Sequence, residues 1–419
     1  MRIVVYPHDL GMGGSQLNAI EIAAGVRDLG HDVVVVGRPG ALNARIAELG
    51  LEFAELPQPG KRPSPGVARA LRRLIDERSI DVLHGYEWPP TLEAELAAVA
   101  RPRVAVVSTV MSMAVPPFIP TSVGLIVGTR EIADHEVRVR HRRRVDVIEP
   151  PVDLTHNRPG LGFDVPGFRT RHALDDDRVT VVAVARFAHE LKLEGTLAAI
   201  DVAADEPRMQ LVLVGDGPAR DEVAARAERA NAVAGRPAVV LTGALDDPRA
   251  AYEAADISLG MGGSALRALA FGSPLIVQGE RGFWRLLTPE SLDAFLWTGW
   301  YGIGRGPEQG ADRLRAILDP LLDDAARRNE LGEYGLEVVR SRFSLENAAR
   351  RQTVIYERAI RDATSRARRS AADLSSLARY SAYYADKRVR RFLGRERTDD
   401  FNARPVTARN AGTAPQGGA

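Results

Sequence analysis

The 419-residue sequence predicts an α/β protein built from two Rossmann-like domains with parallel sheets. Short apolar runs, typical of buried strands, alternate with helical segments along the chain. This series stops at a stretch rich in proline and glycine, residues 150–167, and then begins again. Each half also has a glycine-rich loop directly after a strand. Since the chain is too long for one ordinary domain, we expect two domains that hold a ligand between them.

The composition excludes several classes of function. Lysine and arginine number 56 and aspartate and glutamate 55, so the net charge of +1 argues against a nucleic-acid partner. The absence of cysteine excludes disulfides, a thiolate nucleophile and a cysteine-ligated metal. The first residues predict a strand instead of a signal peptide, and no apolar run reaches about 18 residues. We therefore expect a soluble cytoplasmic protein.

The first domain opens with a strand–helix–strand unit. Arg2–Tyr6 is an apolar strand, helical spacing extends over residues 15–29, and Asp32–Val36 is a buried strand. The loop before the helix contains Gly13 and Gly14 and is similar to a phosphate loop. A dinucleotide site requires an acidic residue after the second strand. This chain has glycine and arginine there, which counts against a nicotinamide cofactor.

Several polar residues follow predicted strands of the first domain. Further strands are predicted near residues 52–55, 81–84, 104–109, 123–128 and 145–148, and helices near 41–49, 65–78 and 91–99. His8, Asp9, His84, Glu87 and the loop 108–113 come after strands. Because ligands bind beyond the carboxyl ends of parallel strands, we predict that these residues line one side of a cleft. For His8 and His84 the alternative is a structural imidazole whose hydrogen bonds are satisfied within the protein.

Two basic segments lie outside the predicted sheets. The run Arg138–Arg144, RVRHRRR, is either a solvated helix face or a patch that faces an anionic membrane or a charged acceptor. Arg361–Arg397 contains 11 arginines and lysines against 4 acidic residues, with part of an amphipathic stripe at Leu377, Tyr380 and Tyr384. Leu374 belongs to the same stripe. This segment either binds an anionic membrane surface or is a solvated helix. The last residues are predicted to be disordered.

The second domain places two cations near the end of a strand. The strand over residues 179–185 stops at Arg186, and Lys192 begins a helix that extends to Asp205. The next strand, Met209–Val214, is followed by Gly215. Two cations and helix-terminal N–H groups suit a pyrophosphate, which carries several negative charges. The alternative is that both cations are surface salt-bridge residues.

The stretch Leu259–Gly279 predicts a strand, a glycine turn, a short helix and a strand. Ser264 is predicted as the N-cap of a helix over Ala265–Phe271. Glycine lets a ligand approach the backbone, and the N–H groups of a helix N-terminus favour an anion. We therefore interpret Gly262, Gly263 and Ser264 as a phosphate site. A tight turn that needs glycine for its geometry alone is the alternative.

Over residues 1–360 the chain resembles family 4 of the retaining, nucleotide-sugar-dependent glycosyltransferases, which have the GT-B fold. The order and spacing of short motifs carry this resemblance. They are Gly13-Gly14 before a long helix, Gly30-His-Asp-Val33 before the second strand, Val147-Ile-Glu-Pro-Pro-Val-Asp153 at the hinge, Arg186 and Lys192, Val214-Gly-Asp-Gly-Pro218, and Ala270-Phe-Gly-Ser-Pro274 in the position of the family's A-x-G-x-P.

The resemblance implies transfer of a sugar from a UDP- or GDP-sugar to an acceptor hydroxyl, with retention of configuration and without a metal or other cofactor. Arg186 and Lys192 would hold the diphosphate. The other implied donor contacts are Gly13, Gly14, Gly215, Gly262, Gly263 and Ser264. A sugar, lipid-linked or small-molecule acceptor would lie against the N-terminal domain. The implied acceptor or sugar contacts are His8, His84 and Glu87.

The implied organisation has four parts. Residues 1–165 form the acceptor-side domain and residues 166–343 the nucleotide-sugar-binding domain. A helix over residues 344–362, with Ser344 as its N-cap, crosses back to the first domain. Residues 363–419 form a basic amphipathic and disordered tail, which allows peripheral membrane association.

The chain departs from the family in its carboxylates. The family usually carries two glutamates eight positions apart, and the matching positions here are Leu259 and Arg267. The loop 108–113 also lacks the family's sugar-contacting histidine. We predict that Glu280, just beyond the last predicted strand, takes over a ribose or sugar contact as a catalytic residue. The alternatives are a catalytically altered homologue that acts as a binding or activating partner, and a nucleotide-sugar epimerase.

Overall fold

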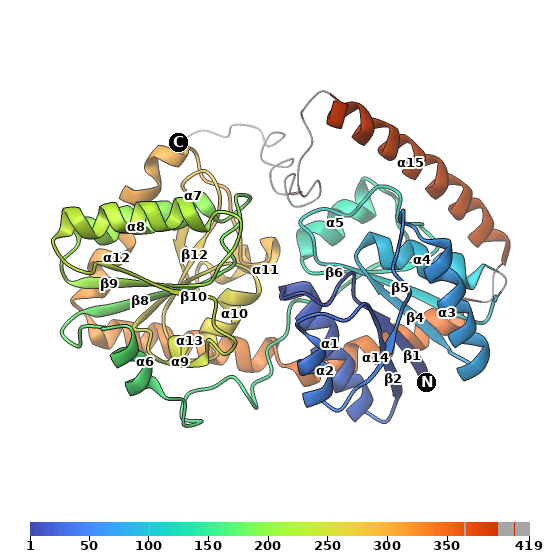
Figure 1. Ribbon diagram of the computed structural model, residues 1–419, viewed down its shortest axis with the longest axis horizontal. Coiled ribbons are helices and arrows are strands. Elements are labelled where there is room, and N and C mark those ends of the chain that lie inside the picture. Colours follow the sequence, from blue (N-terminus) through green and yellow to red (C-terminus); the bar gives the residue numbers. More distant parts are fainter. Residues whose placement is uncertain (100, 364–365, 393–405, 407–419) are drawn as a thin grey trace. The chain divides into compact units, whose positions relative to one another are not determined.

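The computed structural model describes residues 1–99, 101–363, 366–392 and 406 (Figure 1). The chain divides into two compact units. The first contains Met1–Pro151 and the described residues from Leu345 onward, and the second contains Val152–Ser344. Each unit has its own sheet of mostly parallel strands, so the predicted α/β class with two Rossmann-like domains is confirmed.

The first unit is a seven-stranded parallel sheet in the order β3-β2-β1-β4-β5-β6-β7. Its strands are β1 (Arg2–Tyr6), β2 (Asp32–Gly37), β3 (Glu52–Glu55), β4 (Val82–Tyr86), β5 (Ala105–Val110), β6 (Gly124–Val127) and β7 (Val145–Val147). Its helices are α1 (Gly14–Asp28), α2 (Asn43–Glu48), α3 (Pro65–Arg78), α4 (Trp88–Ala98), α5 (Arg130–Arg138), α14 (Leu345–Asp362) and α15 (Arg366–Phe392).

Helices bury both faces of this sheet. On β1, Ile3 and Val5 belong to the core formed with α1 and α14, while Val4 and Tyr6 belong to the core formed with α3 and α4. Successive side chains of a strand point to opposite faces, so a strand covered on both sides is apolar throughout. This is the physical reason why the apolar runs in the sequence predicted the strands.

The second unit is a six-stranded sheet in the order β10-β9-β8-β11-β12-β13, with β13 antiparallel to β12. Its strands are β8 (Val179–Val184), β9 (Met209–Val214), β10 (Val239–Gly243), β11 (Ile257–Gly260), β12 (Leu275–Gln278) and β13 (Trp284–Leu286). Its helices are α6 (Val165–Arg171), α7 (Leu193–Asp205), α8 (Arg220–Ala234), α9 (Arg249–Glu253), α10 (Gly263–Leu269), α11 (Leu292–Thr298), the 3-10 helix η1 (Pro307–Gln309), α12 (Gly310–Leu322) and α13 (Ala325–Arg342). The sequence did not predict the three-residue strand β13.

Each sheet has one point at which the strand order reverses. In the first sheet the chain builds outward from β1 to β3 and then returns to place β4 on the other side of β1. In the second sheet the same reversal brings β11 beside β8. The loops after two such neighbouring strands run to opposite sides, and the resulting crevice is the usual ligand site of open α/β sheets.

The predicted return of the chain to the first domain is confirmed. Helix α14 begins at Leu345 and supplies Ala348, Ala349, Ile355 and Tyr356 to the core that it shares with α1. Burial of these four side chains fixes α14 in the first unit, although it follows the whole second unit in the sequence.

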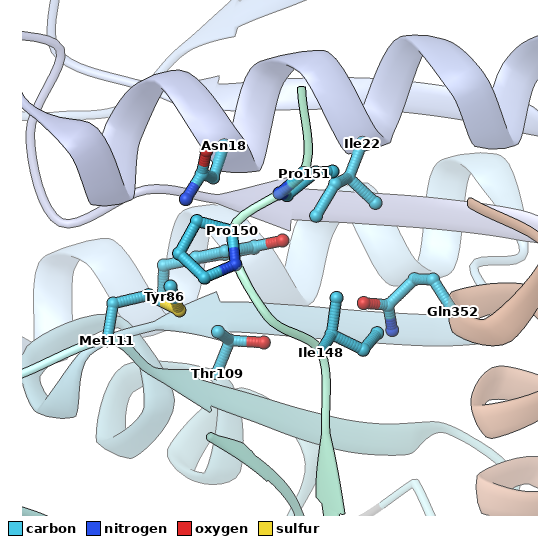
Figure 2. A pocket seen from close by; sticks show the side chains of 9 residues that line it. All are labelled: Asn18, Ile22, Tyr86, Thr109, Met111, Ile148, Pro150, Pro151 and Gln352. Atoms are coloured by element: carbon cyan, nitrogen blue, oxygen red, sulfur yellow. The ribbon is translucent and has the colours of Figure 1, made fainter. Parts of the chain in front are cut away.

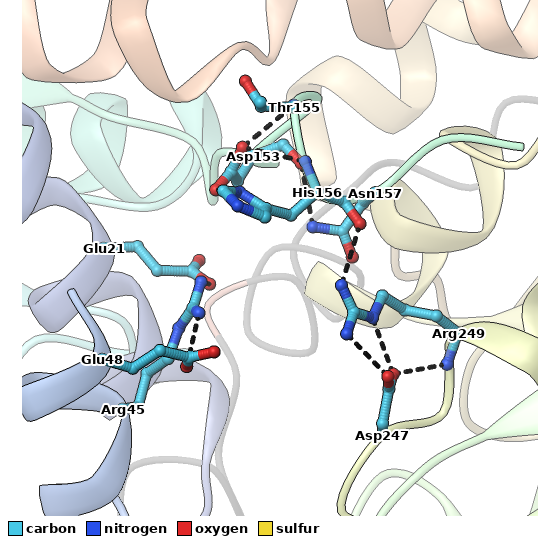
Figure 3. Close-up of polar contacts among 9 residues, drawn as sticks. All are labelled: Glu21, Arg45, Glu48, Asp153, Thr155, His156, Asn157, Asp247 and Arg249. Carbon is cyan, nitrogen blue, oxygen red and sulfur yellow. Dashed lines mark hydrogen bonds and ion pairs between the residues drawn. The ribbon is translucent and has the colours of Figure 1, made fainter. Parts of the chain in front are cut away.

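The boundary between the units lies at Pro151, earlier than the predicted residue 165. Figure 3 shows why the following segment belongs to the second unit. The Asp153 carboxylate accepts the backbone N–H of Thr155 at 3.0 Å. Arg249, at the start of α9, donates to the carbonyl of His156 at 3.2 Å and pairs with Asp247. Proline and glycine in the sequence indicated irregular backbone, but they did not indicate the unit on which it packs.

The described residues of both basic segments belong to the first unit. Helix α5 ends at Arg138, so the run Arg138–Arg144 is not a single helix face as one interpretation required. Within the tail, α15 is helical, as the amphipathic spacing predicted. The prediction of disorder for the last residues lies outside the described residues. Among the helices that the structure describes, none combines the length and the apolar composition that a membrane crossing requires.

Candidate functional site

The second unit has a pocket at the reversal point of its sheet. The pocket measures about 310 Å³ together with the open solvent at its mouth, and it lies at the carboxyl ends of β8, β11 and β12. Its lining residues are Ala183, Val184, Ala185, Phe187, Lys192, Thr196, Leu213, Leu259, Gly260, Met261, Ser264 and Gln278. The predicted cation and the predicted glycine-rich stretch therefore meet at one place, although about 70 residues separate them in the sequence.

Lys192 lines this pocket without a partner for its charge. It is the N-cap residue of α7 and lies half-buried, six residues after the exposed Arg186. Within the described chain, neither side chain has a hydrogen bond or an ion pair. Burial and then the charge of Arg186 lower the pKa of Lys192. Two cations that repel each other without a carboxylate between them form a site suited to an anion.

Gly215 has a structural role close to these cations. Its φ is +152°, and an added Cβ would collide with the carbonyl oxygen of Ala185. Glycine is therefore required here because the loop after β9 approaches the end of β8 closely. This packing positions the segment that carries Arg186, and it accounts for Gly215 without the predicted donor contact.

The glycine turn before α10 differs from the predicted arrangement. The N-cap is Gly262, with φ of +56°, and the helix begins at Gly263. Ser264 is not the N-cap, because it lies inside the first turn and its hydroxyl donates to the carbonyl of Met261 at 3.0 Å. Apart from its chain neighbours, no atom of the described residues lies within 4 Å of a Cβ built on Gly262. The turn thus leaves open space at Gly262, and the phosphate contact of Gly262, Gly263 and Ser264 stays a prediction.

The two positions that lack the family's glutamates differ in their relation to the pocket. Leu259 is buried and forms part of the apolar wall of the pocket. Arg267 is absent from the lining. Burial raises the pKa of Tyr252 to about 12, and the charge of Arg267 lowers it in part, so this guanidinium lies near Tyr252. Neither position supplies a hydrogen-bond acceptor to the pocket.

Sequence reasoning missed Gln278. This last residue of β12 lines the pocket and is 5% exposed, and its amide has no hydrogen-bond partner in the described chain. A buried amide needs partners for its donor and acceptor, so Gln278 is suited to a polar group of a ligand. Its only sequence signal was a polar residue at the carboxyl end of an apolar strand.

Glu280 lies just outside the pocket lining. Its carboxylate accepts a hydrogen bond from the hydroxyl of Tyr301, and its backbone N–H donates to the carbonyl of Gly302 at 3.0 Å. The same loop is tied to α7, because the Glu194 carboxylate accepts the backbone N–H groups of Arg281 and Gly282. The loop is thus held next to the pocket, and the contact of Glu280 with a ligand stays a prediction.

In the first unit, the predicted residues His8 and Asp9 lie together at the reversal point of the sheet. The two side chains pair at 2.8 Å, and the Asp9 carboxylate also accepts from Gln16 at 3.0 Å and from the N–H of Gly11 at 2.7 Å. Burial lowers the pKa of His8, but the hydrogen bond with Asp9 and the charges of Asp9 and Glu87 more than offset this, so the pKa is raised. Both side chains are partly exposed and accessible to a ligand.

Glu87 holds the loop that follows β5. Its carboxylate accepts the N–H of Met111 at 2.8 Å and the hydroxyl of Ser112 at 3.0 Å. Its φ is +66°, a strained conformation for a residue with a Cβ, and such strain is concentrated at functional sites. Glu87 is 8% exposed, so its first role is to position loop 108–113 beside His8.

The prediction that His84 contacts a substrate is wrong. The ring is buried, with Nδ1 2.7 Å from the hydroxyl of Tyr356 and Nε2 2.7 Å from the hydroxyl of Thr109. Burial lowers the pKa of His84 to about 3, so the ring is neutral. Both nitrogens are occupied, and the alternative of a structural imidazole holds: His84 fastens α14 to the sheet.

Figure 2 shows a second pocket, whose lining includes Thr109, the residue whose hydroxyl lies 2.7 Å from His84 Nε2. It measures about 220 Å³ together with the open solvent at its mouth, and its lining residues are Asn18, Ile22, Tyr86, Thr109, Met111, Ile148, Pro150, Pro151 and Gln352. Of the predicted residues, only two members of loop 108–113 contribute to it. Gly13 and Gly14 do not line this pocket. Gly13 is the N-cap of α1 and has an extended φ of −170°, and Gly14 begins the helix. Donor contact of these two glycines stays a prediction.

Comparison with known proteins yields two matches to protein-family models. The model described as "Glycosyl transferase 4-like domain" matches residues 13–146, and the model described as "Glycosyl transferases group 1" matches residues 178–299. Each match lies within one unit, and together they span more than half of the chain.

Among characterised proteins, the chain is similar to the alpha-monoglucosyldiacylglycerol synthase of Streptococcus pneumoniae (strain ATCC BAA-255 / R6). The identity is 25% over 240 residues, which are 55% of this chain and 49% of the synthase. The match therefore spans about half the length of this relative.

Solved structures share the two-unit architecture. A glycosyltransferase from Rickettsia africae ESF-5 has a TM-score of 0.68 at 15% identity, covering 86% of this chain and 98% of that one. Anabaena HepE in complex with UDP-glucose has a TM-score of 0.65 at 14% identity, covering 85% and 99%. The UDP-GlcNAc 2-epimerase of Neisseria meningitidis bound to UDP-GlcNAc has a TM-score of 0.56 at 12% identity, covering 85% and 100%. At these identities the likeness concerns the fold alone.

Proposed function

We propose, from the premise that this chain belongs to the GT-B glycosyltransferases, that it transfers a sugar from a nucleoside diphosphate sugar to an acceptor hydroxyl. The unpartnered charge of Lys192 in the pocket of the second unit is the observation that carries the proposal. A diphosphate would supply the anion that the described residues do not. Lys192 and Arg186 would hold it and stabilise the charge that develops as it leaves.

The donor is proposed to be a UDP- or GDP-sugar. The similar HepE structure contains UDP-glucose, which supports a nucleotide-sugar donor for this fold. Gln278 is positioned to hydrogen bond with a polar group of the donor, since its amide lacks a partner among the described residues. The two cations support charge neutralisation by side chains, so we propose that the transfer needs no metal ion. We also propose retention of configuration, which the family resemblance implies.

The acceptor is proposed to bind at the reversal point of the first sheet. His8 and Asp9 are accessible there and offer hydrogen bonds of the kind that sugar hydroxyls make. Glu87 would act as a positioning residue, because it holds the loop beside them. A sugar, a lipid-linked sugar or a small molecule fits this chemistry, and the similar synthase, named for a glycolipid product, supports a lipid acceptor.

The test of this function is release of nucleoside diphosphate. Purified protein is incubated with UDP- and GDP-sugars, with and without glycoside and glycolipid acceptors, and free UDP or GDP is measured. We expect one donor to release its nucleotide faster when an acceptor is present, and NMR of the product to show the donor's anomeric configuration. Binding without release would indicate a non-catalytic partner, and conversion of the sugar without acceptor dependence would indicate an epimerase; either result would overturn the proposal.

Glu280 is tested by replacement with glutamine. We expect Glu280→Gln to lower donor affinity or turnover by about 10- to 150-fold, because a hydrogen bond to a charged group contributes about 1.5–3 kcal/mol. Titration calorimetry and the release assay measure the two effects separately. Glu330→Gln on the exposed face of α13 is the matched control. Unchanged donor affinity and turnover in Glu280→Gln would show that Glu280 is not part of the site.

A further inference from the structure

The two basic segments of the chain are fastened to one loop of the first unit. In this loop, residues 116–120, the carbonyls of Ile119 and Pro120 accept the guanidinium of Arg142 at 2.7 Å and 3.0 Å. The carbonyl of Phe118 accepts the hydroxyl of Ser376 on α15. The basic run 138–144 and α15 are therefore neighbours on the surface, although more than 200 residues separate them in the sequence.

Aromatic packing fixes α15 on this loop. The ring centroid of Phe118 lies 5.3 Å from that of Tyr380 and 5.0 Å from that of Tyr383. The ring centroid of Trp88, at the start of α4, lies 5.8 Å from that of Tyr380. The hydroxyl of Tyr380 also donates to the carbonyl of Arg62. In Figure 1, α15 runs along the outside of the first unit. One face of the helix is thus used for packing, and the opposite face is turned to solvent.

The solvent-facing side combines apolar side chains with unpaired cations. On α15, Leu377 is 61% exposed and Val389 is 56% exposed, and on the neighbouring run Val139 is 59% exposed. Arg143 and Arg388 are exposed and have neither an ion pair nor a hydrogen bond in the described chain. Apolar residues with basic residues beside them complement an anionic lipid surface, which accepts both the charges and the apolar side chains.

We propose that this face, made of α15 and residues 137–144, docks on an anionic membrane surface. The loop between its two parts continues to Met111 and Ser112, which hold the carboxylate of Glu87. The docking face and the candidate acceptor site are thus linked by one stretch of chain, residues 111–120. The docking itself requires neither donor nor acceptor, so it goes beyond the proposed transfer and is tested without it.

The test uses the full chain and sedimentation with lipid vesicles. One set of vesicles contains phosphatidylcholine alone. In the other set, part of the phosphatidylcholine is replaced by phosphatidylglycerol. We expect binding to the anionic vesicles only, weakened by added salt because salt screens exposed charges. Each basic residue near such a surface strengthens binding by about fivefold, so Arg143→Glu with Arg388→Glu should reduce the partition coefficient by at least about 25-fold.

The matched control reverses the charge of two exposed arginines of the second unit that have no partner in the described chain. Arg229→Glu with Arg313→Glu makes the same change in net charge on α8 and α12 and should leave vesicle binding unchanged. A second variant, Leu377→Asn with Val389→Asn, should weaken binding without changing the charge. The proposal is overturned if the wild-type protein does not bind anionic vesicles, or if the Arg143/Arg388 variant binds like the control. Nucleotide binding in the absence of lipid should stay intact in every variant, so a failure of docking is distinct from a failure of the proposed transfer.

Discussion

Replacing Lys192 by methionine is expected to weaken the binding of the preferred nucleoside diphosphate by about 10- to 150-fold. The ammonium would make a charge-assisted hydrogen bond to the diphosphate, and such bonds contribute about 1.5–3 kcal/mol. Methionine keeps the apolar stem in the pocket but removes the charge. Titration calorimetry with UDP and GDP measures the loss. Lys61→Met, at an exposed position of the first unit, is the control and should bind normally.

The unliganded Lys192→Met protein should lose no stability. Lys192 has no partner in the described chain and repels Arg186, so removal of its charge breaks no interaction that holds the fold. Weaker binding of the nucleotide together with an unchanged free energy of unfolding indicates a residue whose role is to bind the ligand. If the variant binds nucleotide like the wild type, or if it unfolds much more easily, Lys192 is a structural residue and the proposed donor site is wrong.

The pH dependence of binding gives a second readout on the same residue. Burial and the charge of Arg186 lower the pKa of Lys192, so the ammonium loses its proton at a lower pH than an ordinary lysine. Affinity for a diphosphate should be full below this lowered pKa and should fall as the pH rises through it. Arginine stays protonated over this range. Lys192→Arg should therefore move the decline in affinity to higher pH.

The largest loss of stability is expected from Arg142→Met. The Arg142 side chain is 4% exposed and pairs with the Glu136 carboxylate, itself 3% exposed, at 3.0 Å. Its other nitrogens donate to the carbonyls of Ile119 and Pro120. Removing one partner of a buried pair leaves the other charge without compensation, which costs about 3–5 kcal/mol. The measurement is urea unfolding followed by tryptophan fluorescence, to which Trp88 contributes the signal of the first unit.

The neighbouring residue provides a matched control for this prediction. Arg143 is exposed and has no partner in the described chain, so Arg143→Met should change the free energy of unfolding by less than about 0.5 kcal/mol. Equal effects of the two substitutions would show that the run is a uniformly solvated surface. A large loss for Arg142→Met alone would establish that one member of the basic run is an internal anchor of loop 116–120.

The sequence determined the fold class and much of the order of the elements. Strands covered on both faces are apolar throughout, and amphipathic helices repeat their apolar positions at helical spacing, so both are visible in local composition. It also located Lys192 and Arg186, because carboxyl ends of parallel strands can be found by counting elements. These features depend on residues close together in the chain, which is why sequence alone was sufficient.

Only the tertiary structure decided which polar residues are free to bind a ligand. His84 and His8 both follow or end strands in the sequence, yet His84 meets Tyr356, 272 positions away, and has no free nitrogen. Arg142 and Arg143 are adjacent, yet one is buried against Glu136 and the other is exposed. Gln278 became a candidate only when its burial and its lack of a partner were visible. The physical reason is the same in each case: burial and hydrogen-bond partners are set by segments distant in sequence, and they determine whether a polar group is satisfied within the protein or available to a ligand.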